Sequence, residues 1–375
     1  MKILFDSQIF DWQLNGGISR YFIEVLRRLE TNKETEVLFK VRHSYNTYIQ
    51  HSSWLTKGAV LKNLQFKGKL GALKVINEKL NRPYSNGLLK KNVPDIFHPT
   101  YYDTYFLKYL KQKPLVLTVY DLTHEKFNSN SASTRKVLAW KKKLIGIADH
   151  IISISENTKK DIVEFYRISP EKITTTYLSG GFDSIIREAE TVEEMKKIPA
   201  NYILFVGNRR SYKNFRSFIC EVAPVILKND IYLVTAGGGP LDPGEPELMK
   251  KMGIADRVIS FSHVSDQFLA QLYGKALVFI FPSLYEGFGI PVLEAMQCGC
   301  PALLSSNSSL PEVGGSAAAY FDPFTTGELQ KKLQELIADG GERNRMRNAG
   351  MEQVKKFSWD NTAREHIRVY KNLLQ

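Results

Sequence analysis

Short apolar runs alternate with longer amphipathic segments along the whole of this 375-residue chain. Helical patterns, such as those at 19–29 and 134–147, separate runs of strand length. Near-continuous apolar strands that alternate with helices predict parallel sheets covered on both faces. The strand-length runs lie at 3–5, 36–41, 96–98, 115–119 and 150–154, and again at 202–206, 231–236, 257–261, 277–281 and 301–305.

The runs fall into two sets, which predict two doubly wound α/β domains. We expect an N-terminal domain over 1–180 and a C-terminal domain over 181–357, joined through an acidic connection that ends at Pro199. We expect a final helix over 358–375. Whether this helix packs on the N-terminal domain or on the C-terminal domain stays open. Because ligands of open α/β sheets bind beyond the carboxyl ends of the strands, we expect the site in a cleft between the two sheets.

Composition excludes several classes of protein. Apolar residues make up 43% and charged residues 24% of the chain, which is typical of globular proteins and excludes disordered and fibrous ones. No apolar run approaches the ~18 residues of a membrane span, and the N-terminus lacks the pattern of a secretory signal. The 3 cysteines form neither a disulfide framework nor a zinc knuckle. We therefore expect a cytoplasmic protein, with peripheral membrane contact left open.

The formal net charge of +12 lies in the first half of the chain, where residues 1–180 carry 29 Lys and Arg against 16 Asp and Glu. Between Lys57 and Lys91 there are nine basic residues and one acid, Glu78, and 69–82 has apolar residues at helical spacing. A basic amphipathic helix favours an anionic membrane surface. The alternative is a helix packed on its own domain with solvated lysines. No nucleic-acid-binding signature accompanies the charge, so we expect no nucleic-acid partner.

Two loops that follow strands carry groups suited to phosphate. Gly16 and Gly17 open a helix, and their bare N–H groups and the helix terminus favour an anion, although an ordinary turn would look the same. In the segment 206–214, Arg209, Arg210 and Lys213 follow the end of a strand. These three cations are suited to binding a diphosphate; the alternative is a basic loop that is simply solvated.

The segment 282–296 is the most informative part of the chain. A loop with Gly287 and Gly289 carries Glu286, and Pro291 suits the first turn of the helix that follows. Glu294 falls one turn into that helix among apolar residues, where a buried carboxylate needs partners. Sugar hydroxyls are suitable partners, because an ionised carboxylate only accepts hydrogen bonds.

Glu286 and Glu294, separated by seven residues, resemble the paired-glutamate motif of retaining glycosyltransferase family 4, which has the GT-B fold. The resemblance covers most of the chain, since Gly16–Gly17 and the segments 155–161, 206–214, 264–266 and 309–313 follow the same family pattern. It implies two Rossmann-like domains facing across a cleft. It also implies metal-independent transfer of a hexose from a nucleoside diphosphate sugar, without a bound cofactor. GDP-linked mannose-type donors are favoured and UDP-linked donors come next. The implied acceptor is a glycan or a lipid-linked glycan of polysaccharide assembly.

The resemblance also assigns roles to individual residues. Many family members have a histidine near the reacting sugar, and this chain has Tyr120 at that position. We therefore expect Tyr120, Asp121 and His124 to contact the acceptor. The alternative for His124 is a purely structural role. The expected catalytic residues are Glu286, Arg210, Lys213 and Asp121. The expected donor-binding residues are Gly16, Gly17, Gly207, Arg209, Arg210, Lys213, His263, Val264, Glu286, Gly287, Phe288, Gly289, Ile290 and Glu294.

Three other functions remain open at this point. A sugar-nucleotide epimerase or a sugar phosphorylase could use the same fold; an epimerase would release nucleotide and altered sugar without an acceptor, and a phosphorylase would require phosphate or pyridoxal phosphate. A non-enzymatic polyanion-binding protein would tolerate the loss of Glu286 and Glu294.

Overall fold

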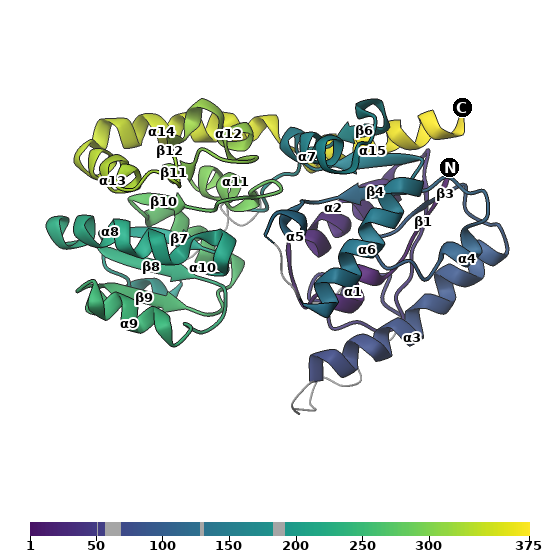
Figure 1. Cartoon of the computed structure of the whole chain (residues 1–375), viewed down its shortest axis with the longest axis horizontal. Helices are drawn as coiled ribbons and strands as arrows, with labels where there is room; N and C mark the ends of the chain where they lie inside the picture. The colour runs from purple at the N-terminus through teal and green to yellow at the C-terminus, as the bar shows by residue number, and fades with distance from the viewer. Residues whose placement is uncertain (51, 57–68, 128–130, 183–191) are drawn as a thin grey trace. The chain divides into compact units, whose positions relative to one another are not determined.

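A computed structural model describes residues 1–50, 52–56, 69–127, 131–182 and 192–375 (Figure 1). The chain forms two compact units: unit 1 comprises Met1–Leu178 with Trp359–Gln375, and unit 2 comprises Ser179–Ser358. Each unit contains parallel strands with helices between them, so the predicted α/β class is confirmed. No helix in the described ranges is long and apolar enough to cross a membrane.

Unit 2 contains a six-stranded sheet in the order β12-β11-β10-β7-β8-β9, and every pairing in it is parallel. Its strands are β7 (Tyr202–Val206), β8 (Tyr232–Ala236), β9 (Val258–Phe261), β10 (Val278–Phe281), β11 (Ala302–Ser305) and β12 (Ala319–Phe321). Its helices are α8 (Phe215–Asn229), α9 (Gly244–Lys251), α10 (Asp266–Lys275), α11 (Ile290–Gln297), α12 (Leu310–Gly314), α13 (Glu328–Ala338) and α14 (Gly340–Gln353).

Unit 1 contains two three-stranded parallel sheets, in the orders β2-β1-β3 and β4-β5-β6, which a bridge between Phe97 and Leu115 links. Its strands are β1 (Lys2–Phe5), β2 (Glu36–Leu38), β3 (Ile96–His98), β4 (Val116–Val119), β5 (His150–Ser153) and β6 (Ile173–Thr175). Its helices are α1 (Gln8–Trp12), α2 (Gly17–Thr31), α3 (Lys69–Lys90), α4 (Leu107–Leu110), α5 (Thr123–Lys126), α6 (Ala132–Ile147), α7 (Glu156–Tyr166) and α15 (Trp359–Leu374).

Burial explains the continuous apolar runs of the central strands. All five residues of β7 and all four of β10 are buried, because helices cover both faces of a parallel sheet. In unit 2 the core also takes in Phe215 and Phe218 from the first turns of α8. The strands that carry the expected site are therefore rigid supports for the loops that follow them.

The last helix, α15, packs against α2 within unit 1 (Figure 1, yellow). Its fully buried His366 lies with Nε2 2.6 Å from the hydroxyl of Tyr21, and Tyr370 lies with its hydroxyl 2.7 Å from Nδ1 of His98. Thr118 on β4 joins the chain of contacts, 2.9 Å from Nε2 of His98. A buried polar network therefore fixes the C-terminal helix on unit 1.

Candidate functional site

The strand order of unit 2 places two loops where open α/β sheets bind ligands. From the centre of the sheet, β7, β8 and β9 follow one another toward one edge, and β10, β11 and β12 follow one another toward the other edge. The order in which successive strands are added therefore reverses between β7 and β10, although all strands are parallel. The loops that follow these two strands are 207–214 and 282–289. Because ligands bind beyond the carboxyl ends of strands at such a reversal, these loops form the candidate site.

Lys213 and Glu286, one from each loop, form an ion pair. Nζ of Lys213 lies 2.5 Å from Oε1 of Glu286, and the two side chains are only 11% and 14% exposed. The ammonium group also lies 5.0 Å from the ring centroid of Phe281 at the end of β10. Because both charges are poorly solvated, each depends on its partner. A diphosphate bound here would compete for Lys213 and release the Glu286 carboxylate for another donor.

Two serines that follow β11 hold the main chain on both sides of Glu286. The N–H of Glu286 donates to Oγ of Ser308 at 2.9 Å. The hydroxyl of Ser309, which is fully buried, lies 3.0 Å from the carbonyl oxygen of Glu286 and 2.9 Å from that of Phe288. Neither serine was singled out as a candidate, because its partners lie 21 to 23 residues away along the chain.

Two glycines of the site adopt backbone conformations that other residues rarely take. Gly207 directly follows β7 with φ 124°, and Gly289 precedes α11 with φ 104°. A Cβ on Gly289 would lie 2.9 Å from Cδ2 of Leu310. Pro291 occupies the first turn of α11, as its sequence position predicts. The helix therefore begins directly after the loop of Glu286, where its dipole favours an anion.

Arg209 and Arg210 have different surroundings. Nε of Arg209 donates to both carboxylate oxygens of Glu245, at 2.9 and 3.1 Å, and its Nη atoms donate to three carbonyl oxygens of the loop 237–240. The side chains of Arg209 and Glu245 are 4% and 5% exposed, whereas Arg210 is exposed. Arg209 is therefore held by contacts within unit 2, and its expected contact with the donor stays a prediction; its partner Glu245 was not among the expected residues.

The remaining donor-side candidates lie on α11 and beyond β9. Glu294 is 6% exposed on α11. Burial and, after it, the charge of Glu294 raise the pKa of the Tyr273 hydroxyl well above its usual value of 10. His263 is exposed and Val264 is half-buried in the loop after β9, an edge strand that β8 separates from β7. These two residues thus lie further along the same carboxyl edge of the sheet.

Unit 1 carries the other candidates. Gly16 and Gly17 open α2, and the carbonyl oxygen of Gly16 accepts a hydrogen bond from the Ser19 hydroxyl at 3.0 Å. Both glycines are at least partly exposed. The loop that contains them follows β1 and α1, so the helix N-terminus of α2 is accessible on this unit.

The structure places Tyr120 in the core rather than at a binding surface. Its side chain is 5% exposed, and its hydroxyl donates to the carbonyl oxygen of Thr100 at 3.1 Å. The ring of Tyr120 is thus held within unit 1, and its expected contact with an acceptor stays a prediction. Asp121 is half-buried, and its Oδ1 accepts from the N–H of Thr123 at 2.9 Å. His124 is half-buried on α5.

The described residues contain no group of three or more His, Cys, Asp or Glu side chains arranged to hold a metal ion. The cationic groups of the candidate site in unit 2 are Arg210 and Lys213. The site can therefore bind an anion through these side chains and through main-chain N–H groups, and it can accept hydrogen bonds through Glu286 and Glu294.

Comparison with protein families matches both halves of the chain. Residues 15–178 match the model described as Glycosyltransferase Family 4, and residues 186–353 match the model described as Glycosyl transferases group 1. The chain is 28% identical over 394 residues to O-antigen chain mannosyltransferase B of Escherichia coli, covering 100% of both chains. It is 30% identical over 240 residues to the serotype-specific mannosyltransferase WbdA of Escherichia coli, covering 61% of this chain and 29% of that longer protein.

Solved structures share the architecture. WaaG, a glycosyltransferase involved in lipopolysaccharide biosynthesis, superposes with a TM-score of 0.72 at 15% identity, covering 99% of each chain. Anabaena Alr3699/HepE, solved in complex with UDP, superposes with a TM-score of 0.68 at 15% identity, covering 99% of this chain and 100% of that one. Likeness at this level of identity shows the fold, and it agrees with the GT-B architecture expected from the sequence.

Proposed function

Because the chain belongs to glycosyltransferase family 4, we propose that it transfers a mannose-type hexose from a GDP-linked donor, with retention, to a lipid-linked glycan in O-antigen or related polysaccharide assembly. The enzyme class follows from the family, in which a nucleotide sugar is the donor. The sugar is suggested by the mannosyltransferases among its relatives. The observation that carries the proposal is the buried pair of Lys213 and Glu286 at the strand-order reversal of unit 2.

In this proposal, Lys213 and Arg210 bind the diphosphate. Lys213 exchanges Glu286 for a phosphate oxygen, and the exposed Arg210 contributes a second cation that forms bidentate contacts. Both cations stabilise the negative charge that develops on the departing nucleoside diphosphate. A low-dielectric site increases this effect, and Lys213 is already largely buried. These side chains supply the charge compensation that Mg²⁺ supplies in other transferases, so transfer is expected without a metal.

The released Glu286 carboxylate and the main-chain N–H groups of 287–290 contact the donor sugar in this assignment. Support comes from the fixed main chain of this loop, which Ser308 and Ser309 hold in place. Glu294 accepts hydrogen bonds from the ribose hydroxyls, and the main chain at 263–264 meets the base. From unit 1, Gly16 and Gly17 contact the diphosphate and sugar, and Asp121 and His124 contact the reacting sugar or the acceptor.

The test of the donor site measures nucleotide binding. A thermal-shift panel of GDP, UDP, ADP and their sugars identifies the base, and GDP is expected to give the largest shift. Lys213→Ala is then expected to weaken binding of that nucleotide at least tenfold by calorimetry, because a buried cation is lost. Lys251→Ala, an exposed lysine on α9, is the matched control and should bind normally. Unchanged nucleotide affinity in Lys213→Ala would contradict the assignment of Lys213 to the diphosphate.

Product analysis separates the proposed reaction from its rivals. With GDP-mannose and a lipid-linked oligosaccharide, the enzyme should release GDP only when the acceptor is present and should extend the acceptor by an α-linked sugar. Release of nucleotide with an altered free sugar would instead indicate an epimerase. A requirement for phosphate or pyridoxal phosphate would indicate a phosphorylase.

We further propose that α3 contacts the anionic cytoplasmic face of a membrane. The basic segment Lys57–Lys91 was expected to form such a surface; residues 57–68 lie outside the described residues, and α3 covers most of the rest. Leu73 is buried against unit 1, but Val75, Ile76 and Leu80 are 50%, 37% and 41% exposed. An outward apolar stripe on a basic helix is typical of an interfacial helix.

Liposome binding tests this part of the proposal. Replacing Ile76 and Leu80 together with serine should reduce co-sedimentation with vesicles that contain 30% phosphatidylglycerol, because the inserted apolar surface is lost. Lys142→Ala combined with Lys143→Ala, two exposed lysines on α6, is the control for charge alone. Equal binding by the serine variant and the wild type would exclude α3 as the membrane contact.

A further inference from the structure

Three aromatic side chains from different elements form a partly exposed cluster on unit 1. Trp12 ends α1, Tyr101 follows β3, and Trp140 lies on α6. The ring centroids of Trp12 and Tyr101 are 5.0 Å apart, and those of Trp12 and Trp140 are 6.3 Å apart. None of the three side chains is fully buried. Because α1 and Tyr101 follow the carboxyl ends of the paired strands β1 and β3, the cluster lies at the edge where ligands of such sheets bind.

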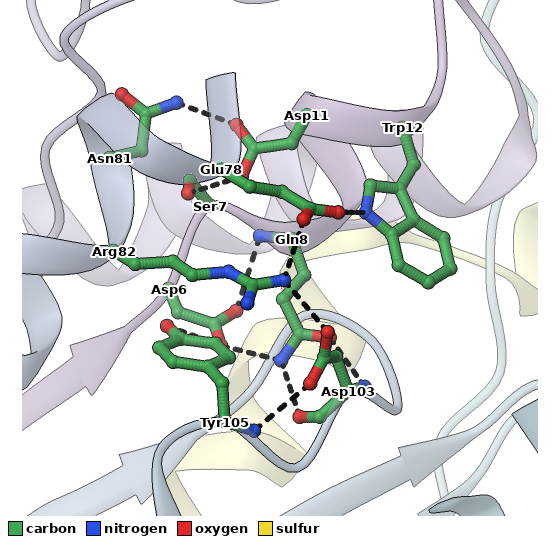
Figure 2. Close-up of polar contacts among 10 residues, drawn as sticks. All are labelled: Asp6, Ser7, Gln8, Asp11, Trp12, Glu78, Asn81, Arg82, Asp103 and Tyr105. Atoms are coloured by element: carbon green, nitrogen blue, oxygen red, sulfur yellow. Dashed lines mark hydrogen bonds and ion pairs between the residues drawn. The ribbon is translucent and has the colours of Figure 1, made fainter. Parts of the chain in front are cut away.

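A polar network fixes the indole of Trp12 (Figure 2). Its Nε1–H donates to Oε1 of Glu78 at 2.8 Å. Oε2 of Glu78 lies 3.0 Å from Nη2 of Arg82, which lies 2.7 Å from Oδ2 of Asp103. In Figure 2 the indole nitrogen faces Glu78 while the rest of the ring system points away from the network. A ring held in this way loses little conformational freedom when a ligand stacks on it.

A deeper layer of the same network joins α1 to the loop after β3. The amide of Gln8 donates to Oδ2 of Asp6 at 2.7 Å and to the carbonyl oxygen of Asp103 at 3.0 Å, and its oxygen accepts from the N–H of Asp103 at 2.7 Å. Oδ1 of Asp6 accepts from the N–H of Thr100 at 2.9 Å. Since Gln8 and Asp6 precede Trp12 while Thr100 and Asp103 flank Tyr101, the network sets the position of one ring relative to the other.

Two lysines lie over the faces of the tryptophan rings, so a sugar that stacks on such a face takes the place of the ammonium group. Nζ of Lys74 lies 3.4 Å from the ring centroid of Trp12, and Nζ of Lys136 lies 4.6 Å from that of Trp140. An acyl chain on this surface would leave these charges without water. A pyranose suits it, because a sugar offers an apolar C–H face to a ring and hydroxyls to these charges.

We propose that Trp12, Tyr101 and Trp140 form a platform on which a pyranose ring of the acceptor glycan stacks, with Lys74 moving off the face of Trp12 to bond its hydroxyls. This inference rests on the proposed function, since a glycosyltransferase needs an acceptor. Glu78 acts through Trp12 and is a positioning residue. The platform explains why α1 and the loop after β3 are joined by so many buried polar contacts: they hold a binding surface in a fixed shape.

The test uses a printed array of oligosaccharides that contain mannose, glucose, galactose or N-acetylhexosamine. The full-length wild type is expected to bind at least one of these classes. Trp12→Ala and Trp140→Ala should each weaken that binding at least tenfold, and Trp140→Phe, which keeps an aromatic face, should retain most of it. Phe165→Ala, an exposed aromatic residue on α7, is the control and should bind as the wild type does.

Separate readouts distinguish failure of the platform from failure of the proposed function. Nucleotide affinity by calorimetry should stay within about twofold in both tryptophan variants. Glu78→Leu should weaken glycan binding, and Glu78→Gln, which keeps an oxygen for the indole N–H, should restore it. Full glycan binding by Trp12→Ala and Trp140→Ala, or no binding of any array sugar by the wild type, would overturn the platform, whereas absence of nucleotide binding by the wild type would overturn the function.

Discussion

Acidification is expected to destabilise unit 1 through His366. The imidazole is fully buried on α15, and burial lowers its pKa from 6.5 to about 4. Its Nδ1 lies 2.7 Å from the carbonyl oxygen of Thr362, and its Nε2 lies 2.6 Å from the Tyr21 hydroxyl, so a neutral ring donates to the first and accepts from the second. Protonation removes the acceptor for Tyr21 and places a charge in the core.

The sign and size of the effect follow from the pKa difference. Above pH 6.5 the imidazole is neutral in the folded and the unfolded chain, so it adds no pH dependence. As the pH falls below 6.5 the unfolded chain binds a proton that the folded chain does not, and the free energy of unfolding decreases. The loss from this group is about 2 kcal/mol at pH 5 and about 3 kcal/mol below pH 4. The pKa of His98, also lowered by burial, adds loss in the same direction.

Tryptophan fluorescence measures this loss for unit 1 alone, because the 4 tryptophans of the chain, Trp12, Trp54, Trp140 and Trp359, all belong to unit 1. Urea denaturation at pH 7 and pH 5 compares the wild type with His366→Gln, which keeps an acceptor for Tyr21 but does not titrate. The variant should lose about 2 kcal/mol less than the wild type between the two pH values.

The matched control is His263→Gln, an exposed histidine of unit 2, which should behave as the wild type. Burial raises the pKa values of Asp6 and Asp11, so their titration acts in the opposite direction. It is common to all three proteins and cancels in the comparison. An equal loss of stability in wild type and His366→Gln would refute the assignment to His366.

Three further substitutions test the packing that supports the site. Lys141→Met removes the cation that pairs with the 1%-exposed carboxylate of Glu125, which keeps a hydrogen bond from Tyr166, and should cost about 3 kcal/mol in urea denaturation of unit 1; a loss below 1 kcal/mol would contradict the buried pair. Gly289→Ala forces a Cβ against Leu310 at positive φ and should lower the stability of unit 2 by about 1–3 kcal/mol in calorimetry, so an unchanged transition would argue against this geometry. Ser309→Ala removes the hydroxyl that contacts the loop of Glu286 and should cost about 1–2 kcal/mol and weaken nucleotide binding; wild-type affinity would show that the loop needs no such support.

Sequence patterns predicted the strands well because central parallel strands are buried on both faces. Each of the ten expected ranges overlaps a strand in the structure. The strands that were not expected, β6 and β12, have three residues each and lie at the edges of their sheets, where the alternation of apolar and polar side chains is too short to detect. The two family models confirm the recognition of the family from the paired glutamates.

The sequence was less informative about which side chains face a ligand. Arg209 and Arg210 are adjacent and chemically identical. Only the fold shows that the guanidinium of Arg209 donates hydrogen bonds to Glu245 and to the loop 237–240. Tyr120 follows a strand directly, as a binding residue would, but its ring turns into the core. The network around Trp12 joins residues more than 60 positions apart, so no local pattern announces it.

The most direct test of the account is transfer by Glu286→Ala. The carboxylate lies at the strand-order reversal. In the proposed mechanism it exchanges its ion pair with Lys213 for hydrogen bonds to the donor sugar. Transfer of mannose from GDP-mannose to a lipid-linked oligosaccharide should fall at least a hundredfold, with a thermal midpoint near that of the wild type. Glu247→Ala, an exposed glutamate on α9, should retain full activity. Wild-type turnover by a folded Glu286→Ala protein would contradict the account.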